Sequence, residues 1–373
     1  MKILQTVKYY EPSKGGMESV VKDIVSSIST KHKDVKFTVY SNNHTRLLNR
    51  NIDSVNNITL IKERTPFIFK SQPLNIKYRS LTKLIADNEI IHHHYPFPNM
   101  ELALIRNIEL LRQRKLIITW HANIKSSRWS WIGKFYDPII KRLLDIAQHI
   151  VVTSPQLLEN SDLLLQYKDK VTVIPLSFDP ALSLNVLPKK YPFNRNIKLL
   201  FVGKLREYKG IKYLIDAVKE LNVNLTIVGD GENATSLAKQ VEILNIESKV
   251  EFKSNLSNED LGKCYLDSDI FVLPSINEAE AFGVVQLEAM ANALPVINTN
   301  LKSGVPYVSL AGITGETVNP ADSNELRLAI ENLISQPQLF EKYSANAVRR
   351  VEMFSRSKLA ENYLKLYSSE SVK

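Results

Sequence analysis

Hydrophobic positions along the chain form short, β-branched runs that alternate with longer segments of helical period. Strands are predicted from these runs in the first half at 2–7, 35–40, 89–93, 116–119, 150–153 and 171–174, and in the second half at 197–202, 224–228, 249–253, 270–273 and 295–298. Continuous apolar strands separated by helices are typical of a parallel sheet covered by helices. The pattern therefore predicts an α/β protein.

The alternation of strands and helices occurs twice, and 373 residues are too many for one ordinary core. Between the two series lie Pro180, Pro188 and Pro192, and proline favours extended backbone over helix. We predict an N-terminal domain over 1–177, a linker over 178–196, a C-terminal domain over 197–354, and a C-terminal helix over 355–373 that packs back on the N-terminal domain.

The net charge of +9 is unevenly distributed along the chain. Residues 1–177 carry 26 Lys and Arg against 15 Asp and Glu, whereas the remaining residues carry 22 against 24. A basic first half favours an anionic partner, although charge alone does not choose among nucleic acid, membrane and acidic substrate. The single cysteine excludes an intrachain disulfide, and no apolar stretch approaches a membrane span, so we expect a cytoplasmic protein.

The segment 273–291 contains the most informative residues, because it combines a strand end, a loop and the start of a helix. Glu280 lies in the loop, the helix opens near Gly283, and Glu288 lies inside it. Free N–H groups at such a helix start suit a diphosphate. We interpret the two carboxylates as ligands of hydroxyl groups, Glu280 on a sugar and Glu288 on a ribose.

The loop after the predicted strand at 197–202 is rich in cations. Lys204 and Lys209 are both placed to reach a pyrophosphate and to stabilise the charge that develops as it leaves. An exposed lysine is more often a solvated surface group, so this signal gains its value from its position after a strand.

The N-terminal half offers three weaker signals. Gly15 and Gly16 follow the first strand and open a helix, which permits close approach of a ligand but equally a simple tight turn. His121 ends another strand, where a packed histidine is the commoner outcome. The run 92–94 consists of three histidines, but neighbours in a strand point to opposite faces, which argues against a metal cluster.

These segments together resemble one family. The spacing of Glu280 and Glu288 matches the E-x7-E signature of retaining glycosyltransferases with the GT-B fold, which has two facing Rossmann-like domains and an interdomain cleft. The residues around both carboxylates resemble glycosyltransferase family 4 in particular. The paired glycines, His121 and Lys209 occur in the order that the family has, so the resemblance spans nearly the whole chain.

The resemblance implies a role for each matching residue. Glu280 would contact the transferred sugar, Glu288 would hold the ribose, and His121 would line the reacting face. Lys204 and Lys209 would bind the diphosphate, although the family usually has arginine in place of Lys204, which makes Arg206 a substitute. The further donor-binding residues that the resemblance implies are Gly15, Gly16, Ala281, Phe282, Gly283 and Val284.

Within the family, segments such as 120–124 look most like bacterial mannosyl- and rhamnosyltransferases that build O-antigen or capsule. This resemblance implies transfer of a hexose, mannose from a GDP-mannose donor, to a hydroxyl of a growing lipid-linked glycan, with retention of configuration. We expect no cofactor and no metal, because the loops that follow the predicted strands lack an Asp-x-Asp pair.

We also expect peripheral attachment at the inner face of the cell membrane and no nucleic-acid partner. Residues 125–144 combine cations with aromatic side chains, a composition that suits an anionic membrane surface. It equally suits a segment whose apolar members, such as Ile140, Leu143 and Leu144, are ordinary core and whose cations are merely solvated. Two alternatives stay open at this point. One is a sugar-nucleotide 2-epimerase of similar fold, against which Phe282 and Gly283 speak, and the other is a non-catalytic protein that binds membrane or nucleic acid through its basic half.

Overall fold

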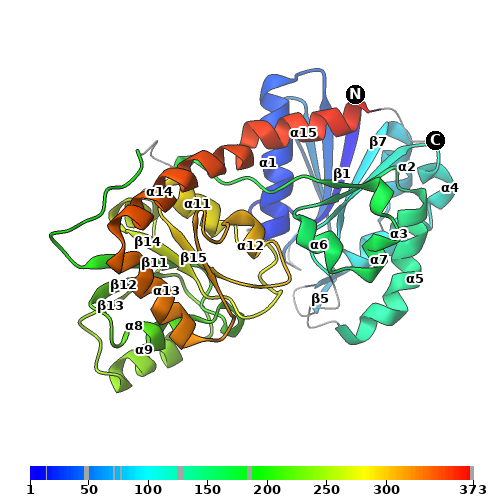
Figure 1. Ribbon diagram of the computed structural model, residues 1–373. Coiled ribbons are helices and arrows are strands. Elements are labelled where there is room, and N and C mark those ends of the chain that lie inside the picture. Colours follow the sequence, from blue (N-terminus) through cyan, green and yellow to red (C-terminus); the bar gives the residue numbers. More distant parts are fainter. Residues whose placement is uncertain are drawn as a thin grey trace. The chain divides into compact units, whose positions relative to one another are not determined.

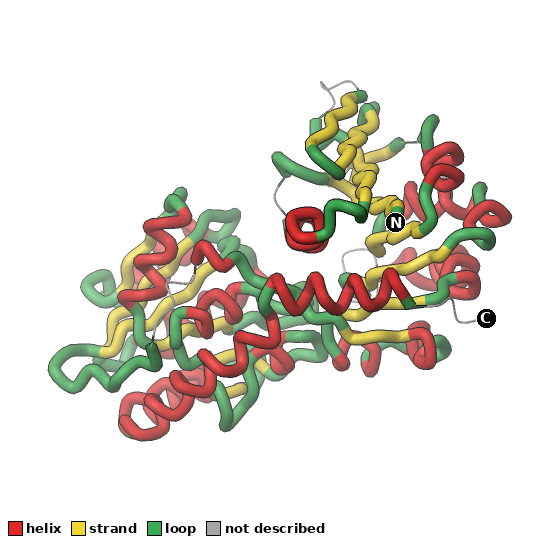
Figure 2. Tube along the Cα trace, turned by 90° about the horizontal axis from the view of Figure 1, so that it is seen from above, coloured by secondary structure: helices red, strands yellow, loops and turns green. Residues whose placement is uncertain are grey.

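The computed structural model describes residues 1–13, 15–45, 50–69, 72–75, 78–123, 130–182 and 187–369 (Figures 1 and 2). The chain divides into two compact units. Unit 1 comprises Met1–Leu176 together with Arg356–Lys373, and unit 2 comprises Ser177–Ser355. The chain therefore leaves unit 1 once and returns to it with its last helix.

The core of unit 1 is an eight-stranded sheet with the order β10-β9-β8-β7-β1-β2-β4-β3. Its strands are β1 Lys2–Tyr9, β2 Lys36–Asn42, β3 Asn51–Val55, β4 Ile58–Glu63, β7 Ile90–Tyr95, β8 Lys115–Trp120, β9 His149–Val152 and β10 Val171–Val173. All neighbours are parallel except β3 and β4. The six predicted strands of this half are confirmed, with ends that differ by one or two residues.

Two strands of this sheet, β3 and β4, were missed by the sequence pattern. Every residue of β3 is exposed, so the strand has no apolar run by which to recognise it. The short strands β5 Phe67–Phe69 and β6 Gln72–Leu74 pair separately from the large sheet.

Helices cover both faces of the sheet in unit 1 (Figure 2). They are α1 Gly16–Lys31, α2 Leu81–Asp87, α3 Pro98–Ile105, α4 Ile108–Leu111, α5 Ser130–Ile146, α6 Pro155–Glu159, α7 Asp162–Leu165 and α15 Arg356–Ser368. One apolar cluster joins the sheet to helices such as α3 and α5. A second cluster joins the opposite face to α1 and α15, because successive side chains of each strand point to opposite faces.

Helix α15 is an integral part of unit 1 and lies beside α1 (Figure 1). Leu359, Tyr363 and Tyr367 are buried against the sheet. At its C-terminus the Lys115 ammonium donates to the carbonyl oxygens of Leu366 and Tyr367, at 2.7 and 3.2 Å. A cation at this end of a helix satisfies carbonyl groups that have no partner within the helix.

Unit 2 has a six-stranded, fully parallel sheet with the order β13-β12-β11-β14-β15-β16. Its strands are β11 Ile197–Val202, β12 Val223–Val228, β13 Val250–Lys253, β14 Ile270–Leu273, β15 Val296–Thr299 and β16 Gly315–Val318. The five predicted strands are confirmed, and β16 was missed. This is the strand order of a Rossmann fold. From β11 the chain adds β12 and β13 on one side of the sheet, and it then crosses to the other side to add β14, β15 and β16.

The helices of unit 2 lie on both sides of this sheet (Figure 1). They are α8 Ile211–Val218, α9 Ala234–Ile243, α10 Asn258–Asp267, α11 Val285–Ala291, α12 Val305–Val308, α13 Ser323–Ser335 and α14 Pro337–Val351.

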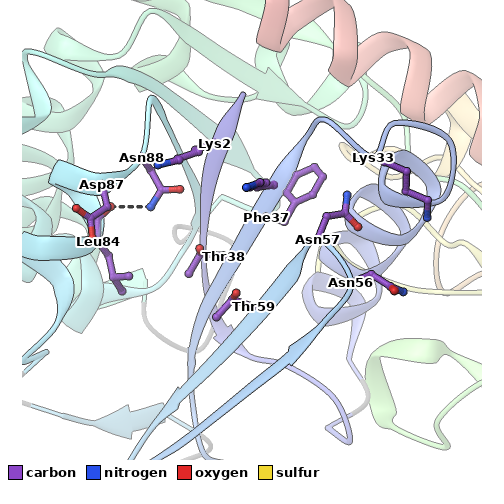
Figure 3. A pocket seen from close by; sticks show the side chains of 11 residues that line it. Lys2, Lys33, Phe37, Thr38, Asn56, Asn57, Thr59, Leu84, Asp87 and Asn88 are labelled. Atoms are coloured by element: carbon purple, nitrogen blue, oxygen red, sulfur yellow. Dashed lines mark hydrogen bonds between the residues drawn. The ribbon is translucent and has the colours of Figure 1, made fainter.

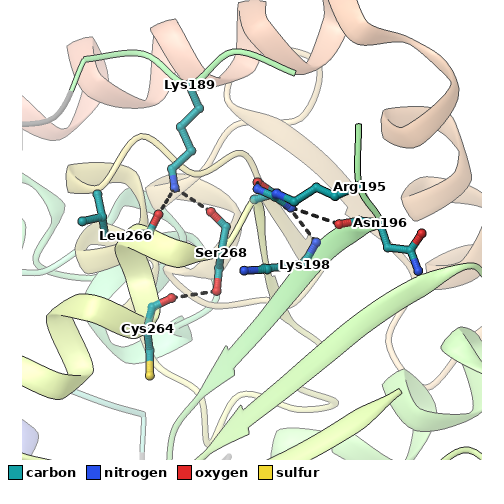
Figure 4. A network of polar contacts seen from close by, with 8 residues as sticks. Lys189, Arg195, Asn196, Lys198, Cys264, Leu266 and Ser268 are labelled. Carbon is teal, nitrogen blue, oxygen red and sulfur yellow. Dashed lines mark hydrogen bonds and ion pairs between the residues drawn. The ribbon is translucent and has the colours of Figure 1, made fainter. Parts of the chain in front are cut away.

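The segment 187–196, predicted as part of a linker, lies within unit 2 and is held against α10 and β14 by polar contacts (Figure 4). The Lys189 ammonium donates to the carbonyl oxygens of Leu266 and Ser268. The Arg195 guanidinium binds both carboxylate oxygens of Asp269, at 2.5 and 2.7 Å. A bidentate pair of this kind fixes geometry as well as charge. The segment therefore has a defined path along unit 2.

Because Leu359 is buried on α15, replacing it with alanine should weaken unit 1 specifically. We expect Leu359→Ala to cost about 2–5 kcal/mol of unfolding free energy. Native-state hydrogen exchange should show faster exchange in β1 and β7 and unchanged exchange in β11 and β14. Ser368→Ala, at an exposed position of the same helix, is the control. Equal loss of protection in both units would contradict the assignment of α15 to unit 1.

Candidate functional site

The reversal of strand order in unit 2 brings together the loops that follow β11 and β14. In open parallel sheets, ligands bind beyond the carboxyl ends of the strands at such a switch point. The backbone N–H of Ile276 donates to the carbonyl oxygen of Tyr208 at 2.8 Å, which joins the two loops. Gly210 has a φ of +65°, and a Cβ there would lie 2.0 Å from the carbonyl oxygen of Pro274. Only glycine allows the loops to approach so closely.

The close approach places Lys209 and Glu280 in direct contact. The Lys209 ammonium forms an ion pair with Oε2 of Glu280, and the hydroxyl of Ser275 donates to the same oxygen at 3.0 Å. Both charged residues are buried, at 7% and 8% exposure. Burial of a lone charge is costly, so each of the two charges requires the other. The structure thus brings together two site residues that are 71 positions apart in sequence.

The other two cations of the β11 loop are arranged differently. Lys204 and Arg206 are exposed, and neither forms an ion pair within the described part of the chain. Both lie before the short 3₁₀ turn η4, Glu207–Lys209, whose last residue carries the buried ammonium. Both side chains are therefore accessible to an anion, whereas the Lys209 charge is already balanced by a carboxylate.

The loop residues 281–284 have a backbone fixed by contacts from several sides. Gly283 has a φ of +74°, which favours glycine, and a Cβ there would lie 2.7 Å from side-chain atoms of Gln286 and Leu273. The carbonyl oxygen of Ala281 accepts from the N–H of Gly304 at 2.8 Å. Phe282 is buried and packs edge-on against Phe354. These residues hold the chain between Glu280 and the start of α11 in one conformation.

Glu288 lies in the first turn of α11 and is bound by a tyrosine from α10. The Tyr265 hydroxyl donates to Oε2 of Glu288 at 2.6 Å, and the Tyr265 side chain is fully buried. Burial raises the pKa of Glu288 above 4.5, the nearby Asp179 carboxylate adds to the rise, and the Tyr265 hydrogen bond opposes it. Tyr265 thus fixes one oxygen of a carboxylate whose charged form is already disfavoured.

In unit 1, Gly15 and Gly16 lie at the start of α1. Gly15 is extended, and a Cβ there would lie 2.3 Å from Oε2 of Glu18, whereas a Cβ on Gly16 would meet no described atom within 4 Å. The Glu18 carboxyl thus lies against the helix start, where a phosphate is expected. Its pKa is raised by burial, although its own backbone N–H and the Lys8 ammonium favour the charged form.

His121 follows the last residue of β8 and contacts a second histidine. Its Nε2 lies 2.9 Å from Nδ1 of His94, and the two rings stack with centroids 5.2 Å apart. Burial, together with the nearby His93, lowers the pKa of His121 to about 3. The ring is therefore neutral at physiological pH and does not act as a fixed cation.

The run of three histidines in β7 divides between the two faces of the sheet, as predicted. His92 and His94 point toward Tyr367 and Gln5, whereas His93 bonds Thr6 on one side and Glu101 on the other, at 2.8 and 3.2 Å. Within the described ranges, no group of three His, Cys, Asp or Glu side chains is placed to hold a metal ion.

One Asp-x-Asp sequence is present in the chain, at Asp267-Ser268-Asp269. It directly precedes β14 and so lies at the amino end of the strands, the edge opposite to Glu280. Asp269 is occupied by Arg195 and by the backbone N–H of Lys198. Asp269 therefore ties the segment 187–196 to the start of β14.

The proposed membrane segment 125–144 is only partly described. Residues 125–129 and the side chains of 130–135 lie outside the described residues. Its later apolar members, Tyr136, Ile140, Leu143 and Leu144, are buried in the core of unit 1. Of the two interpretations of this segment, these residues fit the one in which its apolar members belong to the core, because α5 uses this face to cover the sheet. Among the helices that the structure describes, none is long and apolar enough to cross a membrane.

A pocket of about 890 Å³ opens at the amino ends of the strands in unit 1 (Figure 3). Lys2, Lys33 and Lys36 contribute cations to it, and Asp87 a carboxylate. Lys2 and Lys36 begin β1 and β2, so the pocket lies at the edge opposite to His121.

Several residues that contact the candidate site residues were not predicted from the sequence. Ser275 in the β14 loop and Tyr265 on α10 were not among the predicted site residues. Gln5 and His94 lie inside strands, where polar residues break the apolar run. A polar residue within a buried strand is the signal that could have found them, because buried polar groups need partners.

Comparison with known proteins covers both units. The model of "Glycosyltransferase Family 4" matches residues 14–182, and that of "Glycosyl transferases group 1" matches residues 186–350. The chain is 27% identical to the O-antigen chain mannosyltransferase C of Escherichia coli, over 99% of this chain and 98% of that protein. It is 29% identical to the D-rhamnosyltransferase WbpZ of Pseudomonas aeruginosa, over 73% and 71%.

Solved structures agree with these matches in fold. The structure of HepE from Anabaena in complex with UDP aligns with a TM-score of 0.72 at 18% identity, over 99% of this chain and 100% of that one. Both Rossmann-like units are included in this alignment, as the GT-B fold requires. The chain therefore belongs to glycosyltransferase family 4 and has the GT-B fold.

Proposed function

We propose that this enzyme transfers a hexose, mannose from GDP-mannose, to a hydroxyl of a growing surface glycan with retention of configuration. The proposed donor site rests on the buried Lys209–Glu280 pair at the switch point of unit 2. The similarity to an O-antigen mannosyltransferase along nearly the whole chain supports the choice of sugar and glycan.

The chemistry of the donor site follows from the arrangement of its charges. Glu280 accepts hydrogen bonds from sugar hydroxyls through the oxygen that Lys209 does not occupy. Loss of the sugar leaves negative charge on the diphosphate, and Lys209, Lys204 and Arg206 stabilise that charge. Glu288 accepts from the ribose hydroxyls through its second oxygen, because Tyr265 binds the first.

The remaining donor contacts come from backbone and from unit 1. We assign the N–H groups of residues 281–284 to the sugar and phosphate, and Gly15 and Gly16 to the phosphates. His121 contacts the transferred sugar as a neutral ring. The departing diphosphate oxygen accepts the proton of the acceptor hydroxyl, so no protein nucleophile is required.

We further propose that the acceptor is lipid-linked and that the enzyme acts at the inner face of the cell membrane. The excess of cations in residues 1–177 supports attraction to an anionic surface. The exposed cations, and not the apolar residues of α5, would provide the contact, because those apolar residues are buried.

The choice of donor is tested with purified enzyme and a panel of GDP- and UDP-sugars. We expect release of nucleoside diphosphate from GDP-mannose, strengthened by a lipid-linked glycan acceptor and unchanged by EDTA. Release from a UDP-sugar alone would overturn the choice of donor. Loss of activity with EDTA, restored by a divalent ion, would overturn metal independence.

Glu280→Gln should lower kcat at least about 100-fold, because the carboxylate charge that faces the sugar and balances Lys209 is lost. The amide can still accept the hydrogen bond from Ser275, so circular dichroism should show a folded protein. Glu278→Gln makes the same chemical change two residues earlier in the loop and should keep normal activity. Near-normal turnover of Glu280→Gln would remove Glu280 from the donor site.

Binding of GDP should weaken as the pH falls, because protonation of Glu288 removes the negative charge that strengthens its hydrogen bonds from the ribose. The raised pKa of Glu288 places this loss at a higher pH than for an exposed glutamate. Tyr265→Phe removes the bond that lowers this pKa and should move the loss to still higher pH. Calorimetric titrations between about pH 5 and 8 measure the shift.

Glu288→Gln serves as the reference for this experiment, because an amide does not titrate in that range. This variant should bind GDP more weakly and should lack the part of the pH dependence that comes from Glu288. Identical pH profiles for Tyr265→Phe and the unaltered enzyme would show that the Tyr265 hydroxyl does not act on Glu288.

A further inference from the structure

A buried chain of hydrogen bonds connects His121 to the C-terminal helix α15. Its members all lie in unit 1 and, apart from His121, are at most 3% exposed. In order they are His121, His94, Gln5, Tyr367, His92, Thr119 and Tyr363, and successive links measure 2.9, 2.8, 2.9, 2.8, 2.7 and 3.2 Å. The chain begins at a candidate site residue and ends on a helix more than 230 positions away in sequence.

The donors and acceptors in this chain determine the tautomer of His121. Oε1 of Gln5 can only accept, so Nε2 of His94 carries the proton between them. Burial lowers the pKa of His94 well below its ordinary value, so this ring is neutral and its Nδ1 accepts. Nε2 of His121 must then be the donor to His94.

A neutral His121 with its proton on Nε2 has an acceptor nitrogen at Nδ1. Among the described residues, no hydrogen-bond partner of this Nδ1 is found. The nitrogen is therefore available to accept from a hydroxyl group, such as one on a bound sugar.

The orientation of the Gln5 amide depends on Tyr367. The amide N–H of Gln5 donates to the Tyr367 hydroxyl, whose own proton is then left to donate to Nδ1 of His92, 2.8 Å away. If the amide turned over, its N–H group would face His94, and every proton between Gln5 and His121 would reverse. His121 would then carry its proton on Nδ1 and could not accept at that position.

Tyr367 is held in place by the packing of α15. Lys115 binds the carbonyl oxygen of Tyr367 itself, and the ring packs edge-on against Phe37 with centroids 6.5 Å apart. The hydroxyl that orients Gln5 is thus fixed by contacts independent of the chain of hydrogen bonds.

We propose that Tyr367 is a positioning residue that, through Gln5 and His94, sets the tautomer of His121 and so presents its Nδ1 as an acceptor to a hydroxyl of the bound sugar. The role of His121 toward the sugar rests on the proposed function. The tautomer itself does not, because it follows from contacts within unit 1.

The tautomer is measured by long-range ¹H–¹⁵N correlation spectra of the full chain labelled in its seven histidines. His121 is assigned through the loss of its signals in His121→Gln. In the unaltered enzyme we expect His121 and His94 to be neutral and protonated at Nε2. A proton on Nδ1 of His121 would overturn the proposal without recourse to any variant at Tyr367.

Tyr367→Phe should release the Gln5 amide, so signals of the Nδ1-protonated form of His121 should appear. Tyr363→Phe is the matched control, since it removes a buried hydroxyl from the same helix at the far end of the chain. The control should retain the original tautomer. No change in Tyr367→Phe, or an equal change in both variants, would contradict the role of Tyr367.

Kinetics connect the tautomer to the reaction. Tyr367→Phe should lower kcat about tenfold, the effect of one lost hydrogen bond, with little change in the KM for the donor. In the His121→Ala background, the same substitution should have no further effect, because Tyr367 acts through His121. An undiminished effect in that background would show a merely structural role.

The contact of His121 with the sugar and the positioning role of Tyr367 can be refuted separately. If His121→Ala leaves kcat unchanged, the proposed contact of His121 with the sugar is wrong, whatever the spectra show. If His121→Ala lowers kcat but the tautomer does not respond to Tyr367→Phe, the contact stands and the positioning role of Tyr367 is wrong.

Discussion

The buried ion pair of Lys209 and Glu280 is the interaction on which the candidate donor site depends. Removing two charges from water is costly, and only close contact and further hydrogen bonds offset the cost. The loops meet closely because position 210 has no side chain, and Ser275 supplies an additional bond. A negative diphosphate entering the site would compete with Glu280 for the ammonium. The site is thus arranged so that ligand binding alters an existing pair.

Unit 1 buries many polar side chains between its strands and helices. The face that β7 and β8 turn toward α15 carries His92, His94 and Thr119, all fully buried. His92 and Thr119 bond the two tyrosines that α15 returns to this face, and His94 bonds Gln5, which in turn bonds one of those tyrosines. Buried polar groups without partners would destabilise the unit, so the last helix of the chain contributes hydrogen bonds as well as apolar area.

The two units have their candidate functional residues at corresponding positions of their sheets. The candidate residues lie at or near the carboxyl ends of parallel strands, His121 after β8 and the β11 and β14 loops at the switch point. The opposite edges carry contacts that close the structure, such as Asp269 with Arg195. Asp269 at that edge serves the fold, although the sequence Asp267-Ser268-Asp269 resembles a metal motif.

The sequence alone determined the α/β class, eleven strands and the order of the loops. These features are local, because a strand buried on both faces must be a continuous apolar run. It failed for β3, β4 and β16, which bury less surface than the central strands, and for the short pair of β5 and β6. For α5 it left membrane contact and core packing open, because an amphipathic helix buries the same apolar face in either setting.

Only the tertiary structure decided which side chains meet. Glu280 with Lys209, Glu288 with Tyr265, and Gln5 with Tyr367 are contacts across 71, 23 and 362 positions. Each depends on the order of strands in a sheet or on the return of the last helix to unit 1. No local pattern of hydrophobic and polar residues encodes those distances, so the motifs predicted the loops while the fold determined the hydrogen bonds within them.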